Sequence, residues 1–488
     1  MLSAANIRWF YGLTGLFVAA LGVALYTEHY EVAAVPVVLG VLWAAFFRTA
    51  DVYLFIVLFT PISLNLEQLD IGGIGFYLPT EPLLAGLTLL LFFKVLSDKS
   101  FSDVALYRHP IVVIVLLQLT WAFMTAISSE LPLVSFKYLA ARLWFVVPCF
   151  FFAISVFKGN TARIQRFFLL YMVPLAAVIL YTVARHSTFG FEKDAGHWVM
   201  EPFFKDHTSY GAVLAMFTPV LFGMLLQKRF NLLMKVILGL LFAILVMGVV
   251  LSYTRAAWVS LVVALGVLGV LTLRIRFRTI VGAVALLGAF LWFAQDDLVI
   301  ALERNKQDSS DNFSEHVESI SNVSSDASNL ERLNRWNCAF ALFADRPLVG
   351  WGPGTYQFVY APFQRSKDRT IISTNNADGG NAHSEYFGPL AEQGVPGMLL
   401  MVALVFVVCA RAFQLIYRLR ERENRIIVIS VFLGLITYYV HGTLNNYLDT
   451  DKASIPFWGF TAILVAADLY LEKGNQEKRQ PNTAVSST

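Results

Sequence analysis

Charged residues are scarce in this chain of 488 residues, where Asp, Glu, Lys and Arg together make up 15% of the sequence. An ordinary soluble domain carries about 25% of these residues, so the chain lacks the charge to cover a water-facing surface of its size. Apolar residues of the set AVILMFWYC supply 57% instead, and they gather in long runs. This balance excludes a cytosolic enzyme and a disordered chain, and it predicts an all-α integral membrane protein.

Cysteines and metal- or nucleotide-binding motifs are equally scarce. The three cysteines are Cys149, Cys338 and Cys409, two of them in apolar runs, so no disulfide framework is indicated. No Walker A, HExxH or CxxC motif occurs, and no pair of carboxylates at an external span end fits the pattern of a metal-dependent transferase. The sequence therefore predicts no metal ion, no cofactor and no ATP-driven pump. The net charge of +3 is too small to indicate a nucleic-acid partner.

The apolar runs predict about 12–14 transmembrane helices, because about 20 apolar residues cross the hydrocarbon core of a bilayer. The predicted spans are 9–26, 32–47, 52–63, 78–96, 111–127, 138–157, 164–184, 208–226, 232–252, 255–272, 278–294, 395–417, 425–441 and 455–471. The second and third are short, and they form two spans, one broken span or a re-entrant pair.

The distribution of Lys and Arg predicts the orientation, because these residues concentrate on the cytoplasmic side of short loops. With a cytoplasmic N-terminus, the inside segments carry most of the 37 Lys and Arg residues. The chain then divides into N-terminal transmembrane helices (1–200), central transmembrane helices (201–294), a large external loop (295–394), C-terminal transmembrane helices (395–471) and a polar cytoplasmic tail (472–488).

The large loop contains one predicted amphipathic helix. Its apolar residues recur at spacings of three and four, which gives one apolar face, and Pro347 ends it. These residues are Leu333, Trp336, Phe340 and Phe343. We expect the helix to pack against the bundle or to lie on the membrane surface. The segment Gly350–Gly354 that follows is a predicted tight turn, since glycine permits positive φ.

The end of this loop carries a candidate catalytic histidine. The segment from Gly379 to Tyr386 contains His383 and leads to Gly394, just before the next predicted span. Histidine titrates near neutral pH and can act as a general base. A helix that starts at Ser384 would hold the ring near its positive end and keep it neutral. The alternatives are a later helix start, at the interruption by Gly388-Pro389, and a histidine that only hydrogen-bonds the loop backbone.

Several cations stand at or within predicted spans. Arg255 opens a span on the external side, where its guanidinium either binds an anion such as a phosphate or pairs with head groups or a loop carboxylate. Lys205 and His207 lie at the mouth of another span, and the neighbouring Asp206 or Thr208 is a predicted helix cap. Arg142 falls inside a span, as an ion-pair partner or as part of a polar cavity.

Three elements, in this order, resemble the bacterial O-antigen ligase/polymerase family of integral membrane glycan transferases. The first is Ser252–Trp258 (SYTRAAW) at a span start. The second is Arg335-Trp336 followed by Pro347–Gly354 in the large loop, and the third is His383 with a glycine at Gly394. The resemblance covers residues from about 204 to 400, and the earlier part of the chain matches only as generic spans.

The resemblance implies transfer of a glycan from an undecaprenyl-diphosphate carrier, without a metal ion, at the outer face of the bacterial inner membrane. The acceptor would be lipid A core, another carrier-linked glycan or a protein hydroxyl, and the sequence does not decide between ligase and polymerase. The catalytic loop would be periplasmic and both termini cytoplasmic. Membrane lipids are the remaining expected partners.

The resemblance also implies roles for individual residues. His383 matches the histidine that activates the acceptor, and Arg255 matches an arginine that binds the diphosphate. A second family arginine has no direct match, so either Lys205 replaces it, or Arg185 reaches the site, or the role is lost. His207, Arg335 and Arg142 are secondary candidates. Val259 stands where the family has a leucine, four residues after Arg255.

A transporter, either a flippase for lipid-linked glycans or a solute permease, is the alternative function. A transporter places charged groups at mid-membrane on broken helices, and Arg142 alone fits that description. It also has less use for a long external loop that ends in a histidine. A sensor or scaffold whose loop binds a partner protein is a third possibility.

Overall fold

The structure, a computed structural model, describes residues 4–28, 40, 43–44, 46–66, 76–97, 104–293, 327–365 and 380–471. The chain forms two compact units, Met1–Phe55 and Ile56–Thr488. The first unit contains α1 (Ala4–Tyr26) and most of α3 (Thr49–Phe59). Most of the predicted span 32–47, the first part of the large loop and the tail 472–488 lie outside the described residues.

The helical membrane fold predicted from the sequence is confirmed, and the chain is a multi-pass membrane protein. Within the described part of the chain, nine helices are long and apolar enough to cross a membrane. They are α6 (Pro110–Ile127), α7 extended through α8 (Pro132–Phe157), α9 (Thr161–Ser187), α10 (His207–Leu225), α11 (Leu232–Leu251), α12 (Arg255–Thr272), α18 (Phe387–Arg418), α19 (Arg422–His441) and α20 with its extension (Asp451–Leu471). Of the other predicted spans, 9–26, 52–63, 78–96 and 278–294 correspond to α1, α3, α4 (Thr80–Ser97) and α13 (Phe277–Phe293).

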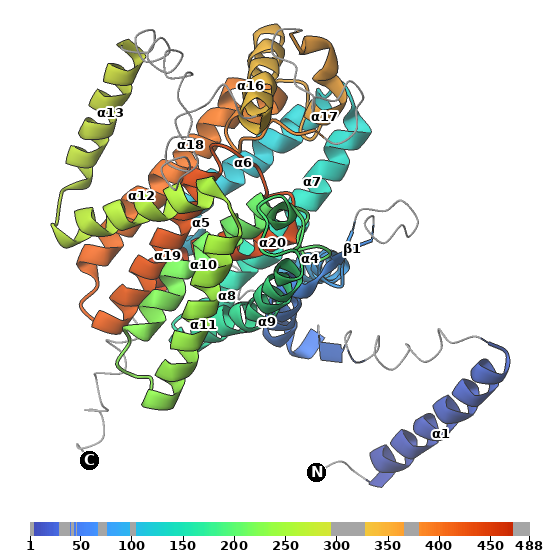
Figure 1. Cartoon of the computed structure of the whole chain (residues 1–488). Coiled ribbons are helices and arrows are strands. Elements are labelled where there is room, and N and C mark those ends of the chain that lie inside the picture. The colour runs from blue at the N-terminus through green and yellow to red at the C-terminus, as the bar shows by residue number, and fades with distance from the viewer. Residues whose placement is uncertain are drawn as a thin grey trace, which may run out of the picture. The chain divides into compact units, whose positions relative to one another are not determined.

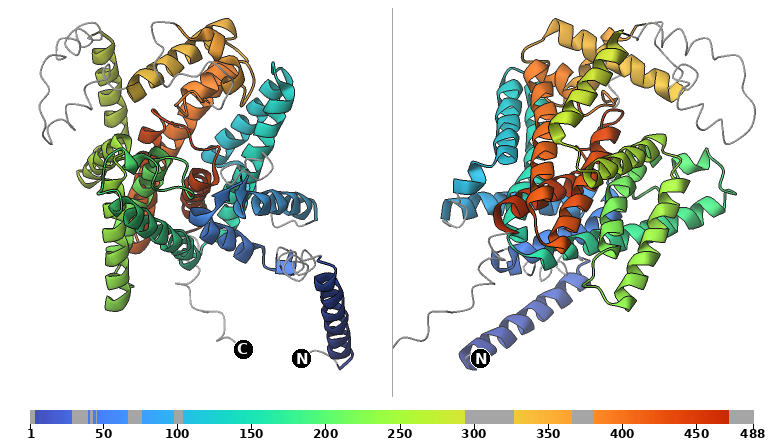
Figure 2. Two further views of the ribbon diagram at one scale, coloured as in Figure 1. Left: turned by 45° about the vertical axis from the view of Figure 1, so that its right-hand side comes forward. Right: turned by 90° about the vertical axis from the view of Figure 1, so that its left-hand side faces the viewer.

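The centre of the bundle is formed by α20, which is drawn in red in Figure 2. Its most apolar window is 83% buried, and those of α10 and α19 are each 72% buried. The corresponding windows of α11 and α12 are only 22% buried, which leaves wide apolar faces for lipid. Two small residues allow α10 and α19 to approach closely: a Cβ at Gly223 would meet Ser430, and one at Gly434 would meet the backbone of Met216.

The loops at one end of the bundle are tied to each other by hydrogen bonds. The Thr254 hydroxyl before α12 donates to the His207 carbonyl at the start of α10, at 2.7 Å. The Glu385 N–H before α18 donates to the Gly442 carbonyl after α19, also at a short distance of 2.8 Å. Of the two predicted caps of α10, the structure shows Asp206, whose Oδ1 accepts from the Thr208 and Ser209 N–H groups. Residues far apart in the sequence therefore meet at this end.

The loop helix α16 (Ala327–Asp345) packs against α18 together with the short α17 (Tyr356–Val359), as Figure 1 shows. The predicted apolar face is only partly covered: the rings of Trp336 and Phe340 pack against Phe387 of α18, but Leu333 is 36% and Phe340 is 44% exposed. The side chains that α16 buries are those of Glu331, Asn334, Arg335, Cys338, Ala339 and Leu342. The neighbours of α16 decide which of its faces is covered, and they enclose a Glu–Arg pair.

Two glycine-dependent features fix the backbone beside α16. Gly350, Gly352 and Gly354 have φ values of 65°, 110° and 75°, which confirms the predicted tight turn. α18 begins at Phe387, earlier than the predicted span, and bends at Gly394, where φ is 69° and ψ is −167°. A Cβ at Gly394 would collide with the backbone of residues 347–348, so only glycine fits this contact.

Candidate active site

Two neighbouring cavities open among the loops at this end of the bundle. The first, which we name the histidine cavity, has a volume of about 350 Å³ and is lined by both His383 and His207. The second, the loop cavity, has a volume of about 660 Å³ and reaches Tyr356 and Glu392. Lining residues shared by the two cavities are Lys205, Gly380, Asn381, Asn446 and Asp449.

Local hydrogen bonds place His383 at the wall of the histidine cavity. The His383 N–H donates to Oδ1 of Asn381 at 3.0 Å, and the histidine takes a left-handed φ of 48°. The Ser384 hydroxyl accepts from the N–H groups of Tyr386 and Phe387, which starts α18. These short-range bonds make a turn that ends just before the helix and exposes the imidazole to the cavity.

The surroundings of His383 favour its neutral form. Burial, together with the nearby guanidinium groups of Arg332 and Arg335, lowers the pKa of the imidazole from its usual 6.5 to about 4. A neutral imidazole has a free ring nitrogen that can accept a proton from a hydroxyl. Chemically, His383 can therefore serve as a general base at neutral pH.

Lys205 and His207 reach the same cavity from the loop before α10. Lys205 is exposed and lines both cavities, so its ammonium group is available to an anionic ligand. His207 is the first residue of α10, and its ring stacks on that of His197 with centroids 4.3 Å apart. The histidine cavity thus combines the His383 imidazole with the His207 imidazole and the Lys205 ammonium group, which come from a distant part of the chain.

Sequence reasoning missed Arg332, which also lines the histidine cavity. Its Nε donates to the Leu444 carbonyl at 3.3 Å, which ties α16 to the loop after α19. The signal was present, because Arg332 lies three residues before Arg335 and so occupies the same side of a helix. Arg335 itself is directed elsewhere: it pairs with Glu331 at 2.6 Å and lies over the Tyr360 ring.

The comparison with known families agrees with the sequence resemblance. Residues 240–402 match the family described as O-antigen ligase. This stretch is an O-antigen ligase domain. That family is one of membrane glycan transfer, of the ligase or polymerase type, with lipid-linked glycan substrates. No curated protein matches the chain.

The O-antigen ligase domain supplies only part of the cavity wall. It runs from α11 into α18 and includes Arg332 and His383. Lys205 and His207 precede it in the sequence, and the segment from Asn445 to Lys452 follows it. The cavity is therefore formed jointly by the domain and by segments that precede and follow it in the sequence.

Lys452 is a second lining residue that sequence reasoning did not single out. It is the second residue of α20, and its Nζ donates to the carbonyls of Thr60 and Ser63 at 2.5 and 2.8 Å. The adjacent Asp451 accepts from the hydroxyls of Ser63 and Thr80. The available signal was a lysine at the external end of a predicted span, against the orientation rule.

Three predicted arginines lie outside the histidine cavity wall. Arg255 starts α12 directly after Thr254, which binds the His207 carbonyl, yet Arg255 is not among the residues that line either cavity. Arg142 lies over the Trp458 ring at 5.1 Å and lines a small cavity beside the loop cavity. Arg185 donates to the Glu201 carbonyl at 2.6 Å.

Proposed function

We propose that the protein transfers a glycan from a polyprenyl-diphosphate carrier to an acceptor hydroxyl, as an O-antigen ligase or polymerase. One observation supports this most strongly: His383 of the O-antigen ligase domain lines a cavity with Lys205 and Arg332. A base for the acceptor and cations for the diphosphate are thus close together. The position at a loop-rich end of the bundle suits a donor whose polyprenyl chain must stay in lipid.

In the proposed reaction, the acceptor oxygen attacks the anomeric carbon of the donor glycan and forms the new C–O bond. His383 takes the proton of the acceptor hydroxyl. The bond from the anomeric carbon to the diphosphate oxygen breaks, and the diphosphate leaves with the electron pair. Lys205 and Arg332 stabilise the negative charge that develops on it, while Arg255 guides the carrier toward the cavity from the start of α12.

The same charges adjust the basicity of His383 to the reaction. In the free protein, burial and the adjacent arginines keep its pKa near 4. A diphosphate bound beside Lys205 and Arg332 would offset these positive charges and raise that pKa toward neutrality. The histidine becomes a stronger base only when the donor is bound.

We further propose that the reaction requires neither ATP nor a metal ion, since cleavage of the sugar–diphosphate bond supplies the free energy. The donor is an undecaprenyl-diphosphate-linked glycan. The acceptor is a glycan, lipid A core or a protein hydroxyl at the periplasmic face of the bacterial inner membrane.

The test is transfer by the purified protein in detergent, with a polyprenyl-diphosphate glycan, an acceptor, a metal chelator and no ATP. We expect product to form under these conditions. A transporter would form none, because it moves its substrate without changing it and a detergent solution has no compartment to fill. A scaffold would form none, because it catalyses no transfer. A deletion strain would then identify the acceptor: lipid A core without long chains indicates a ligase, and single repeat units indicate a polymerase.

A further inference from the structure

A third and larger cavity lies at the opposite end of α12 from Arg255. It has a volume of about 860 Å³ and is enclosed by the end of α12, the turn into α13, and α18 with the start of α19. Its walls share no residue with the histidine cavity or the loop cavity. The proposed glycan transfer therefore does not account for it.

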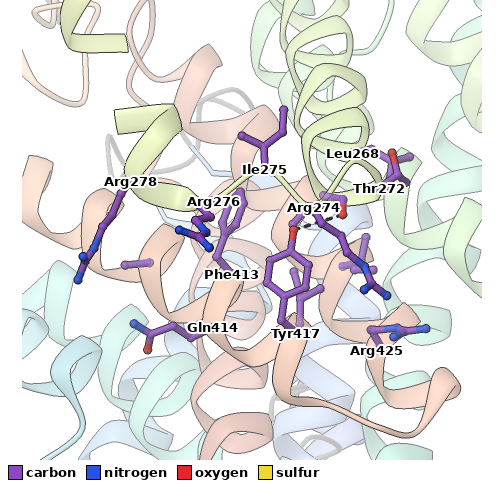
Figure 3. A pocket seen from close by; sticks show the side chains of 14 residues that line it. Leu268, Thr272, Arg274, Ile275, Arg276, Arg278, Phe413, Gln414, Tyr417 and Arg425 are labelled. Atoms are coloured by element: carbon purple, nitrogen blue, oxygen red, sulfur yellow. Dashed lines mark hydrogen bonds between the residues drawn. The ribbon is translucent and has the colours of Figure 1, made fainter. Parts of the chain in front are cut away.

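Four arginines surround this cavity, which we name the four-arginine pocket: Arg274, Arg276, Arg278 and Arg425. In Figure 3, Arg274 and Arg425 lie on one side of it and Arg278 on the other. All four side chains are exposed, and none is seen to form an ion pair with another described residue. No acidic residue is among those that line the pocket. Four positive charges thus gather without an ion-pair partner among the described residues.

Most of the rest of the wall is apolar. Leu268, Leu271 and Ile275 come from α12 and the turn after it, and Phe413 and Ile416 come from α18. The hydroxyl of Tyr417 donates to the Leu271 carbonyl at 3.2 Å, as the dashed line in Figure 3 shows. This bond holds α18 against α12 and keeps the apolar slot open between them.

We propose that the four-arginine pocket binds one anionic phospholipid, with the phosphate among the guanidinium groups and an acyl chain along the apolar wall. Guanidinium groups match phosphate oxygens in geometry and charge. The pocket lies at the ends of spanning helices, which is the depth of the lipid head groups. The predicted orientation puts it in the cytoplasmic leaflet, where basic pockets between helices bind anionic lipids. A free phosphate ion would leave the apolar wall unused.

The test is a lipid titration of the full-length protein in detergent, followed by native mass spectrometry. Dioleoyl phosphatidylglycerol is compared with dioleoyl phosphatidylcholine, so that only the head-group charge differs. The wild type should bind phosphatidylglycerol about 10-fold or more tightly than phosphatidylcholine. The double variant Arg276→Gln/Arg425→Gln removes one arginine from the turn between α12 and α13 and one from α19. It should lose this preference.

The matched control is Arg420→Gln/Arg422→Gln, which removes two exposed arginines next to the pocket that do not line it. It should keep the preference, and a loss as large as that of the pocket variant would overturn the proposal. Ala410→Phe fills the apolar slot and should weaken binding of the lipid while the arginines remain. Inorganic phosphate or a polyprenyl diphosphate that displaces phosphatidylglycerol at equal concentration would also overturn it.

Discussion

Positively charged side chains gather near both ends of α12, but their surroundings differ. Near its start, Lys205 and Arg332 line a cavity together with His383, His207 and carboxylates such as Asp449. Near its end, the four-arginine pocket is lined by arginines and apolar side chains, without a histidine or an acid among the described lining residues. An anion can be held by cations alone, but a reaction that moves a proton needs a group that changes protonation state. The comparison separates the proposed catalytic site from the proposed lipid-binding site.

The largest expected effect comes from removing the imidazole. His383→Ala should lower kcat by about 10² to 10⁴, the usual contribution of a general base. His197→Phe is the matched control, because His197 is exposed and lines neither cavity, and a phenyl ring keeps the stacking on His207. It should stay within about twofold of the wild type in the same transfer assay. An equal loss of kcat in both variants would mean that the two histidines affect activity only by stabilising the fold.

The cations of the histidine cavity should have the next largest effect. Lys205→Gln and Arg332→Gln should each lower kcat by about 10², because each removes a positive charge from the leaving diphosphate. Lys193→Gln removes an exposed lysine from the same loop as Lys205, outside both cavities, and should change little. Unchanged kinetics in both cavity variants would move the diphosphate site elsewhere.

The pH dependence of kcat/KM distinguishes a site that accepts a proton from a site that only binds an anion. The pKa of His383 is lowered to about 4, so the ring is neutral, and competent as a base, above that pH. Protonation removes the base as the pH falls through the pKa. We expect kcat/KM to be constant from about pH 7 to about pH 5 and to fall below that by up to about tenfold per pH unit. A fall of kcat/KM already near the usual histidine pKa would contradict the lowered pKa of His383.

The smallest predicted effect concerns the backbone that supports the cavity end. Gly394→Ala forces a left-handed residue with a Cβ against residues 347–348, and it should destabilise the fold by about 1–3 kcal/mol. Gly266→Ala, inside α12, meets nothing within 4 Å and should be neutral or stabilising. Thermal melts in detergent compare the two variants, and equal Tm values would show that the bend at Gly394 tolerates a side chain.

Features that depend on short stretches of sequence were predictable. The main spans follow from apolar runs, the Asp206 cap from one side chain next to a helix start, and the turn around Gly352 from closely spaced glycines. The gathering of Lys205, His207 and His383 at one end of the bundle followed from counting alternating spans. Each of these depends on composition or chain order and not on how the elements pack.

Features that depend on packing were not predictable. α16 buries Glu331 and Arg335 and leaves Leu333 partly exposed, because its neighbours and not its own periodicity decide which face is covered. Arg332 lines the cavity through a contact with the loop after α19, a segment far along the chain. Arg255 was expected at the site, but the packing of Thr254 on α10 leaves it outside the cavity wall.

The most direct test of the account is an experimental structure with a non-transferable polyprenyl-diphosphate glycan bound. We predict that the diphosphate contacts Lys205 and Arg332, and that the first sugar faces His383 across the histidine cavity. A diphosphate found instead in the four-arginine pocket, or beside Arg142 within the bundle, with His383 remote from the sugar, would contradict it.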